Sequence, residues 1–167
     1  ALNEKLIIFG VPPTYPATGY GYIKSEKQLD HNLFTACKVE RFIEKPDEKT
    51  AKQLIKDKKY SWNSGMFVFK SSSILSEIKN FAPEILRNCE KSLMNGRKDL
   101  DFFRIEKESF IRCEDVSIDI SVFEKTKKAF VIPLICGWDD LGSWESIWKM
   151  SKKDINGNFL NGRVLTQ

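Results

Sequence analysis

The sequence lacks the features that mark membrane, secreted and zinc proteins. No apolar run approaches the roughly 20 residues that a helix needs to cross a bilayer, and the first residues show no leader pattern. There is one histidine, His31, and none of the four cysteines forms a Cys-x-x-Cys pair, which argues against a zinc site. We therefore expect no membrane partner and a cytoplasmic protein with buried, reduced thiols at Cys37, Cys89, Cys113 and Cys136.

Concentrated positive charge is also missing. The net charge is +4 over 167 residues, and most lysines are interleaved with acidic residues. No nucleic-acid-binding motif accompanies them, so we expect no nucleic-acid partner, although a local patch for a phosphorylated ligand is compatible with this surface. A hydrophobic fraction of 41% and a charged fraction of 30% are typical of a globular domain that buries its own core.

Strand and helix patterns share the chain, which predicts an α/β fold. Apolar or alternating runs predict strands at residues 6–11, 37–44, 66–69 and 129–135. Helical spacing predicts helices at residues 47–58, 71–81, 83–94 and 144–148, with Asp47 as the N-cap of the first. It favours a helix over a strand at 117–126. Residues 99–104 are expected to be helical or looped, and residues 109–113 extended. The first strand begins almost at once, so we expect that another segment normally precedes it.

Two glycines follow a stiff loop after the first strand. Three prolines within residues 12–16 exclude a helix there. Gly19 and Gly21 flank an aromatic residue and predict close approach of the backbone to a neighbouring group. A plain turn is the alternative, because Gly-x-Gly alone is weak evidence.

Polar side chains lie next to two predicted strands. Glu44 and Lys45 stand where the strand at 37–44 ends; a carboxylate can accept hydrogen bonds from sugar hydroxyls, and a lysine can meet a phosphate. Asn63 precedes the strand at 66–69 and offers both a donor and an acceptor to a sugar. The alternatives are ordinary charged residues at a strand end and an asparagine–glycine type turn.

Paired aspartates occupy the segment Cys136–Trp148, between a predicted strand and a predicted helix. Carboxylates at such a strand end suit Mg²⁺, which prefers oxygen ligands and usually keeps substrate phosphates in its shell. Alternatively, Asp139 and Asp140 only cap the helix and complement its dipole.

Motifs in a fixed order carry a family resemblance. They are Phe-Gly-Val-x-Pro-Thr-x-Pro-x-Thr-Gly-Tyr-Gly-Tyr-Ile (9–23), Arg-Phe-Ile-Glu-Lys-Pro (41–46), Trp-Asn-Ser-Gly-Met-Phe (62–67), Ser-Ile-Asp (117–119) with Glu-Lys-Thr (124–126), and Gly-Trp-x-Asp-x-Gly-Ser-Trp (137–144). From Leu6 to about Val164 the chain closely resembles the bacterial mannose-1-phosphate guanylyltransferases, including those fused to a mannose-6-phosphate isomerase domain.

The resemblance implies a nucleotide-diphospho-sugar transferase fold, a Rossmann-like mixed sheet with helices on both faces. It implies that mannose 1-phosphate attacks the α-phosphorus of GTP, giving GDP-mannose and pyrophosphate with Mg²⁺ as cofactor. By this likeness Thr18 and Gly19 line the sugar pocket, while Glu44 and Asn63 bind mannose hydroxyls. Lys45 meets the sugar phosphate, and Asp140 rather than Asp139 is the metal ligand, which makes Lys45 and Asp140 the expected catalytic residues.

The chain departs from the family pattern in one respect. The family's glycine-rich loop with an arginine, its Pro-Lys pair and its second metal-binding aspartate have no match in this sequence. Residues 1–152 are therefore expected to be the sugar-phosphate-binding half of a nucleotidyltransferase domain, and residues 153–167 a turn-rich connection to a further module. We expect that this chain by itself does not turn over GTP. A homo-oligomer is compatible with the resemblance.

Two other functions stay open. One is a different sugar-1-phosphate nucleotidyltransferase, for example one using glucose 1-phosphate with UTP or dTTP, because the base is selected in the unmatched half. The other is a non-catalytic regulatory subunit that binds a nucleotide sugar. The presence of Lys45 and Asp140 argues against the second, since a purely regulatory domain does not need a metal ligand.

Overall fold

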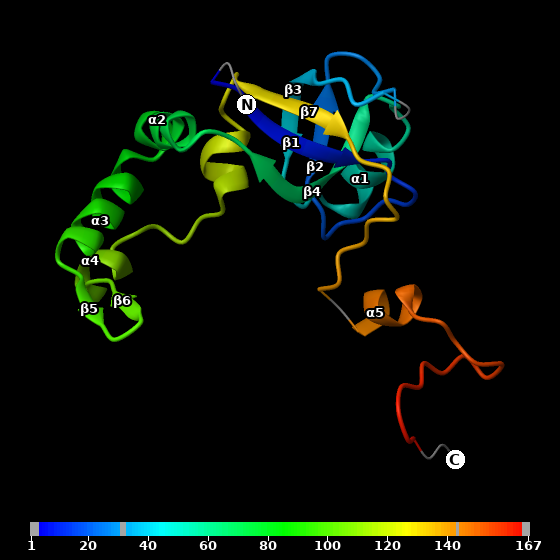
Figure 1. Cartoon of the computed structure of the whole chain (residues 1–167). Coiled ribbons are helices and arrows are strands. Elements are labelled where there is room, and N and C mark those ends of the chain that lie inside the picture. The colour runs from blue at the N-terminus through cyan, green and yellow to red at the C-terminus, as the bar shows by residue number, and fades with distance from the viewer. Residues whose placement is uncertain (1–3, 31–32, 143, 165–167) are drawn as a thin grey trace. The chain divides into compact units, whose positions relative to one another are not determined.

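The computed structural model describes residues 4–30, 33–142 and 144–164 of the chain (Figure 1). His31 lies outside the described residues. The chain divides into two compact units, Ala1–Ile135 and Cys136–Gln167. The predicted functional boundary at residue 152 stays a prediction.

The strands of the first unit close on themselves. They are β1 (Leu6–Val11), β2 (Tyr22–Ser25), β3 (Cys37–Ile43), β4 (Tyr60–Val68) and β7 (Ala129–Pro133). Their hydrogen-bonded order is β1-β4-β2-β3-β7, with β7 returning to β1. The β1–β7 pair is parallel and its neighbours are antiparallel, so the sheet is mixed, as predicted.

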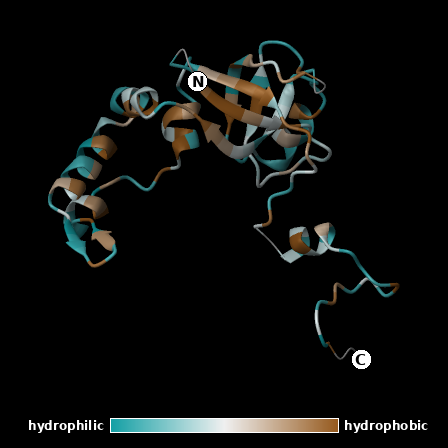
Figure 2. Cartoon of the chain, in the orientation of Figure 1, coloured by the Kyte–Doolittle hydropathy of each residue, from teal (hydrophilic) through white to brown (hydrophobic). Residues whose placement is uncertain are grey.

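Apolar side chains of these strands meet inside the closed sheet. Ile8, Ile23 and Val131 are fully buried there, and Figure 2 shows hydrophobic residues concentrated on the strands. The ring of Phe67 stacks on that of Phe123, with 4.5 Å between centroids. Burial of each such side chain contributes about 1.5–3 kcal/mol, so the core holds the strand ends, where the polar candidates lie, in fixed positions.

The helices lie in the connections. Helix α1 (Glu48–Leu54) follows β3, and Asp47 caps it as predicted, since its Oδ1 accepts from the backbone N–H of Thr50 at 2.6 Å. A long excursion leaves β4 and returns to β7 (Figure 1). It contains α2 (Ser71–Phe81), α3 (Pro83–Met94), the hairpin β5 (Arg97–Asp99) and β6 (Phe102–Arg104), α4 (Lys107–Ile111) and the π-helix η1 (Asp119–Phe123).

Two local predictions in this excursion are wrong. Residues 99–104 form the β5–β6 hairpin, in which Leu100 has a positive φ of 52° and the Arg104 guanidinium donates to Asp99 at 2.9 Å. Residues 109–113 are mostly helical, because the carboxylate of Glu106 accepts from the backbone N–H of Ser109 at 2.8 Å and caps α4. Both errors arise where a polar side chain bonds to nearby backbone or to a cross-strand partner, which hydrophobic spacing does not report.

The thiols are less buried than predicted. Cys37 is buried, Cys89 and Cys113 are half-buried, and Cys136 is exposed. The Sγ atoms of Cys89 and Cys113 lie 3.8 Å apart. Uniform burial was therefore a wrong expectation, because only one of these cysteines lies in a strand of the closed sheet.

The second unit contains the predicted helix, α5 (Trp144–Met150). Beyond it, Asp154 closes a turn by accepting from the backbone N–H of Asn156 at 2.9 Å and of Asn158 at 2.8 Å. The Trp148 indole donates to Gly157 O at 2.7 Å and ties the turn to the helix. Among the described residues, no helix is long and apolar enough to cross a membrane.

Candidate functional site

A bulge in β4 positions Asn63. Ile8 pairs with Phe67 but Gly10 pairs with Asn63, so β4 carries extra residues opposite Phe9. Gly65 lies in the bulge with a positive φ of 72°, and its backbone N–H donates to Asn63 Oδ1 at 3.1 Å. Contrary to the prediction from the sequence, Asn63 thus lies inside a strand rather than before one, and its side chain is held by the bulge of that strand.

Glu44 and Lys45 follow β3 with different degrees of freedom. The backbone N–H of Glu44 donates to Glu124 Oε1 at 3.1 Å, and its side chain is 14% exposed. Lys45 has a positive φ of 41°, which is uncommon for a residue with a side chain. Its ammonium lies 3.5 Å from Glu44 Oε1, and the side chain is 65% exposed. The carboxylate is therefore largely buried, while the lysine remains accessible to a charged ligand.

Gly21, not Gly19, is the place of close backbone approach. A Cβ on Gly21 would lie 2.7 Å from Glu44 Oε2 and 3.2 Å from Asn63 Cβ. A Cβ on Gly19 would meet nothing within 4 Å. Gly19 and Thr18 are both exposed, and their predicted place in the sugar pocket stays a prediction. Glu44 and Asn63 both approach Gly21, and a side chain at this position would have to displace the Glu44 carboxylate.

Aromatic side chains hold the loop before Gly21. Tyr15 and Tyr20 pack edge-on against Trp62, with ring centroids 4.9 and 5.2 Å away. The Tyr22 hydroxyl donates to Ala17 O at 2.9 Å. The proline-stiffened loop is thus anchored beside the start of β4, where Asn63 lies.

Asp119 belongs to this cluster, although sequence reasoning assigned it no role. Asn63 Nδ2 donates to Asp119 Oδ1 at 3.0 Å, between residues on β4 and η1. Asp119 stands in the Ser-Ile-Asp motif, and that motif was the available signal. Because the segment fits both a strand and a helix, its spacing could not show which side chain faces the site.

Burial makes this cluster electrostatically unusual. It raises the pKa of the Asp119 carboxyl, an effect that the hydrogen bond from Asn63 and the charge of Lys45 partly offset. Burial also raises the pKa of Glu44; the nearby Asp119 charge adds to this and Lys45 opposes it. A carboxylate that burial shields from water in this way is a strong hydrogen-bond acceptor for a ligand hydroxyl.

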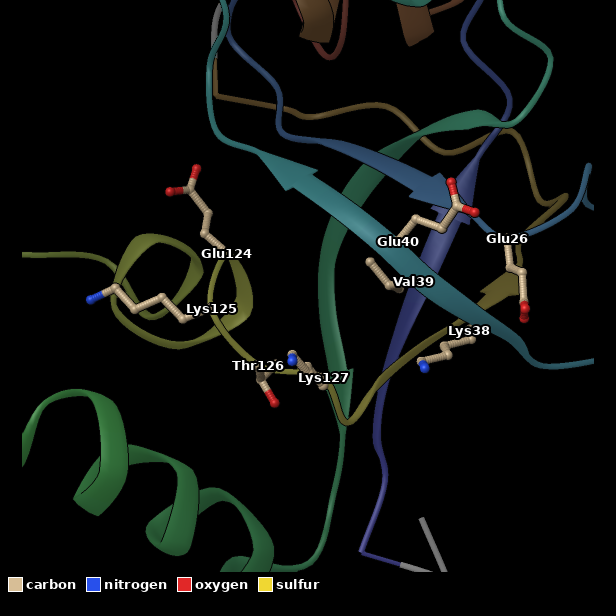
Figure 3. A pocket seen from close by; sticks show the side chains of 8 residues that line it. All are labelled: Glu26, Lys38, Val39, Glu40, Glu124, Lys125, Thr126 and Lys127. Carbon is tan, nitrogen blue, oxygen red and sulfur yellow. The ribbon is translucent and has the colours of Figure 1, made fainter.

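A separate groove lies beside this cluster. It has a volume of about 590 Å³ and is lined by Glu26, Lys38, Val39, Glu40 and residues 124–127 (Figure 3). None of the predicted site residues lines it. Its connection with the cluster is Glu124, whose carboxylate holds the backbone of Glu44. The mixture of lysines and glutamates gives this groove no preference for one sign of charge.

Asp140 lies in the second unit and is exposed. A Cβ on Gly142 would lie 3.4 Å from Asp140 Oδ1, so the glycine leaves space beside the carboxylate. Within the described part of the chain, no group of three or more His, Cys, Asp or Glu side chains could hold a metal ion. The single exposed carboxylate of Asp140 fits Mg²⁺ that is otherwise bound by substrate phosphates. The predicted roles of Asp140 as the metal ligand and of Lys45 as the ligand of the sugar phosphate stay predictions.

Comparison with known proteins decides the family. The pattern of the nucleotidyl transferase family, described as "Nucleotidyl transferase", matches residues 1–157. The chain belongs to this family. It is 47% identical over 164 residues to mannose-1-phosphate guanylyltransferase RfbM of Salmonella typhimurium, covering 98% of the chain and 34% of that protein. It is 43% identical over 169 residues to the alginate biosynthesis protein AlgA of Pseudomonas fluorescens, covering 100% of the chain and 34% of that protein.

Two solved structures have a fold similar to that of this chain. One is described as mannose-6-phosphate isomerase from Helicobacter pylori, with a TM-score of 0.71 and 35% identity over 84% of this chain and 53% of that one. Another is described as mannose-1-phosphate geranyltransferase from Thermus thermophilus, with a TM-score of 0.70 and 27% identity over 88% and 40% of the two chains. The predicted fold is thereby confirmed as that of the nucleotidyl transferases, and the chain spans about a third of the curated relatives' length.

Proposed function

We propose that this chain supplies the sugar-phosphate side of a guanylyltransferase that makes GDP-mannose and pyrophosphate from GTP and mannose 1-phosphate. Relatives named mannose-1-phosphate guanylyltransferase are 41–47% identical to it over nearly its whole length. Relatives named for alginate and xanthan biosynthesis match it equally well. We place the enzyme in the cytoplasm, where GTP is available.

One observation carries the proposal: a buried carboxylate and an accessible lysine at the end of β3 lie close to an amide held in the bulge of β4. Glu44 and Asn63 surround Gly21, and Lys45 is paired with Glu44 at 3.5 Å. A neutral sugar needs acceptors and donors for its hydroxyls, and its phosphate needs a cation. In this proposal Glu44 and Asn63 take the mannose hydroxyls and Lys45 takes the phosphate.

The chemistry asks for positioning and for charge stabilisation. A phosphate oxygen of mannose 1-phosphate attacks the α-phosphorus of GTP, and pyrophosphate leaves, so no covalent enzyme intermediate is needed. Lys45 offsets part of the repulsion between the two phosphates. Asp140 would hold Mg²⁺, which when bound adds charge neutralisation on the phosphate oxygens.

A second activity in the whole protein is compatible with this proposal. The Helicobacter pylori neighbour is named for mannose-6-phosphate isomerase, and the chain covers only 34% of its curated relatives. We propose that the whole protein joins the guanylyltransferase to an isomerase of that kind.

Two measurements test the proposed function. Calorimetric titration of this chain with mannose 1-phosphate should show saturable binding, stronger than that of glucose 1-phosphate. A coupled pyrophosphate assay with GTP and Mg²⁺ should show turnover for the whole gene product but not for this chain alone. Equal affinity for both sugar phosphates would favour a transferase for another sugar. Robust GDP-mannose production by the isolated chain would refute the assignment of one half-site to it.

A further inference from the structure

The Asn63 amide has its hydrogen-bonding capacity divided between the protein and the site. An asparagine amide offers two donors on Nδ2 and two acceptor positions on Oδ1. One acceptor position is taken by the Gly65 backbone N–H at 3.1 Å, and one donor is given to Asp119 Oδ1 at 3.0 Å. One donor and one acceptor remain, which is the pair that a sugar hydroxyl requires.

These two contacts define one orientation of the amide. If the amide were rotated by half a turn, its NH₂ would face the Gly65 N–H and its oxygen would face the Asp119 carboxylate. A donor would then face a donor, and an acceptor would face an acceptor, around a side chain that is only 9% exposed. Unsatisfied buried polar groups are expensive, so the carboxylate of Asp119 stabilises the orientation that presents a donor to the ligand.

The π-helix η1 serves both sides of the site. Its first residue, Asp119, holds the Asn63 side chain, while Glu124 directly after it holds the backbone N–H of Glu44 at 3.1 Å. The backbone N–H of Glu124 donates to Asp119 O at 2.9 Å, closing the wide turn that brings both carboxylates to the same end of the closed sheet. Such single π-turns occur frequently at functional sites.

We propose that Asp119 is a positioning residue that orients the Asn63 amide toward a sugar hydroxyl and thereby sets the affinity for the sugar part of a hexose 1-phosphate. The proposal rests on the proposed function, because it assumes that the cluster binds a sugar phosphate. It concerns the hydroxyl side of the ligand. Lys45 takes the phosphate in the proposed function, and its charge also acts on the Asp119 carboxyl.

The test compares three variants of the chain by titration with mannose 1-phosphate and with inorganic phosphate. Asp119→Ala should weaken mannose 1-phosphate binding about tenfold or more, the loss typical of a hydrogen bond to a charged group. It should not weaken phosphate binding, because it removes a negative charge that acts on Lys45. Asp119→Asn should retain most of the affinity, because its amide oxygen can still accept from Asn63. Asp115→Asn alters an exposed aspartate in the preceding connection and should change nothing.

A structural readout accompanies the titration. In ¹⁵N-labelled chain, the Asn63 side-chain amide proton that is bonded to Asp119 should exchange slowly in the wild type and in Asp119→Asn, and quickly in Asp119→Ala. Wild-type affinity in Asp119→Ala would overturn the proposal. Equal losses in Asp119→Ala and Asp119→Asn would also overturn it, because a direct role of the negative charge would then be responsible. Wild-type chain that binds no sugar phosphate would instead refute the proposed function.

Discussion

The contrast between Gly19 and Gly21 gives the sharpest test of the site. In Gly21→Ala the new Cβ would lie 2.7 Å from Glu44 Oε2 and 3.2 Å from both Asn63 Cβ and Phe42 Cζ. The carboxylate is the end of a flexible side chain and can swing away, whereas Asn63 and Phe42 must give only by a few tenths of an ångström. We therefore expect a stability loss of about 1 kcal/mol, at the low end of overpacking costs.

The functional loss should be larger than the stability loss. Displacing the Glu44 carboxylate removes a charged acceptor from the sugar, which corresponds to about 1.5–3 kcal/mol, or roughly 10- to 150-fold in the dissociation constant of mannose 1-phosphate. Gly19→Ala is the matched control, since its Cβ meets nothing within 4 Å. It should fold with unchanged or slightly higher stability, because alanine restricts the unfolded chain.

Urea unfolding and calorimetric titration of both variants measure the two effects separately. Gly21→Ala with wild-type affinity would show that Glu44 does not contact the sugar. Loss of affinity in Gly19→Ala alone would restore the interpretation based on the sequence, in which Gly19 lines the pocket. Loss of folding in Gly21→Ala would contradict the expected flexibility of Glu44.

Four further outcomes are expected. Lys45→Gln should weaken phosphate and mannose 1-phosphate binding together and change the urea midpoint little, because this side chain is 65% exposed; selective loss of sugar binding would contradict its role. Asp47→Ala should lower the urea midpoint, since Asp47 Oδ1 caps α1 by accepting from the backbone N–H of Thr50. The same hydrogen bond lowers the pKa of Asp47, so the stability that the cap contributes should be lost as pH falls through that pKa. A difference in stability between the two proteins that did not change with pH would contradict this role of the carboxylate. Peroxide treatment should join Cys89 and Cys113 in a disulfide, because their Sγ atoms are 3.8 Å apart. The intact mass should fall by two hydrogens per chain, and Cys113→Ser should abolish this change. Because burial raises the pKa of the Cys89 thiol, the reaction should accelerate with rising pH. At neutral pH Asp119→Asn should unfold at a urea concentration equal to or higher than that of the wild type, and in acid at a lower one. Folding raises the pKa of the Asp119 carboxyl, so its contribution to stability is complete below the unfolded pKa and is lost as pH rises through the folded pKa. Glu44, Lys45 and Glu124 face the same carboxyl, and parallel pH profiles of the two proteins would show that these charges compensate.

Local chemistry explains which parts of this structure could be predicted from the sequence. The cap at Asp47 and the helix after Pro83 depend on neighbouring residues, and both are confirmed. Glu44, which follows β3, and Asn63, on β4, both lie next to Gly21. Their joint assignment to a sugar came from the family resemblance and stays a prediction. Gly21 was not distinguished from Gly19, because both are equally permissive in sequence and only a packed neighbour separates them.

The site residues that were missed share one physical cause. Asp119 and Glu124 act on residues 56 and 80 positions away in the chain, and hydrophobic periodicity carries no information about partners at such distances. The exposure of Cys136 has a similar origin, since a thiol in an apolar sequence context is buried only if a second layer covers it.

The hydrogen bond between Asn63 and Asp119 explains how the site tolerates the long excursion that follows β4. Asn63 lies on β4 before α2 begins, and Asp119 returns to the closed sheet after α4 ends, so their hydrogen bond joins both ends on the same core. The cost of closing a connection grows only slowly with its length, and the buried Val122 and Phe123 secure the return. Changes within residues 83–112 should therefore alter stability locally without changing the Asn63 amide, whereas Val122→Ala should loosen η1 and weaken sugar binding together with stability. Slow exchange of the Asn63 amide in a Leu100→Gly variant, and fast exchange in Val122→Ala, would distinguish this arrangement from one in which the whole excursion supports the site; fast exchange in both would refute it.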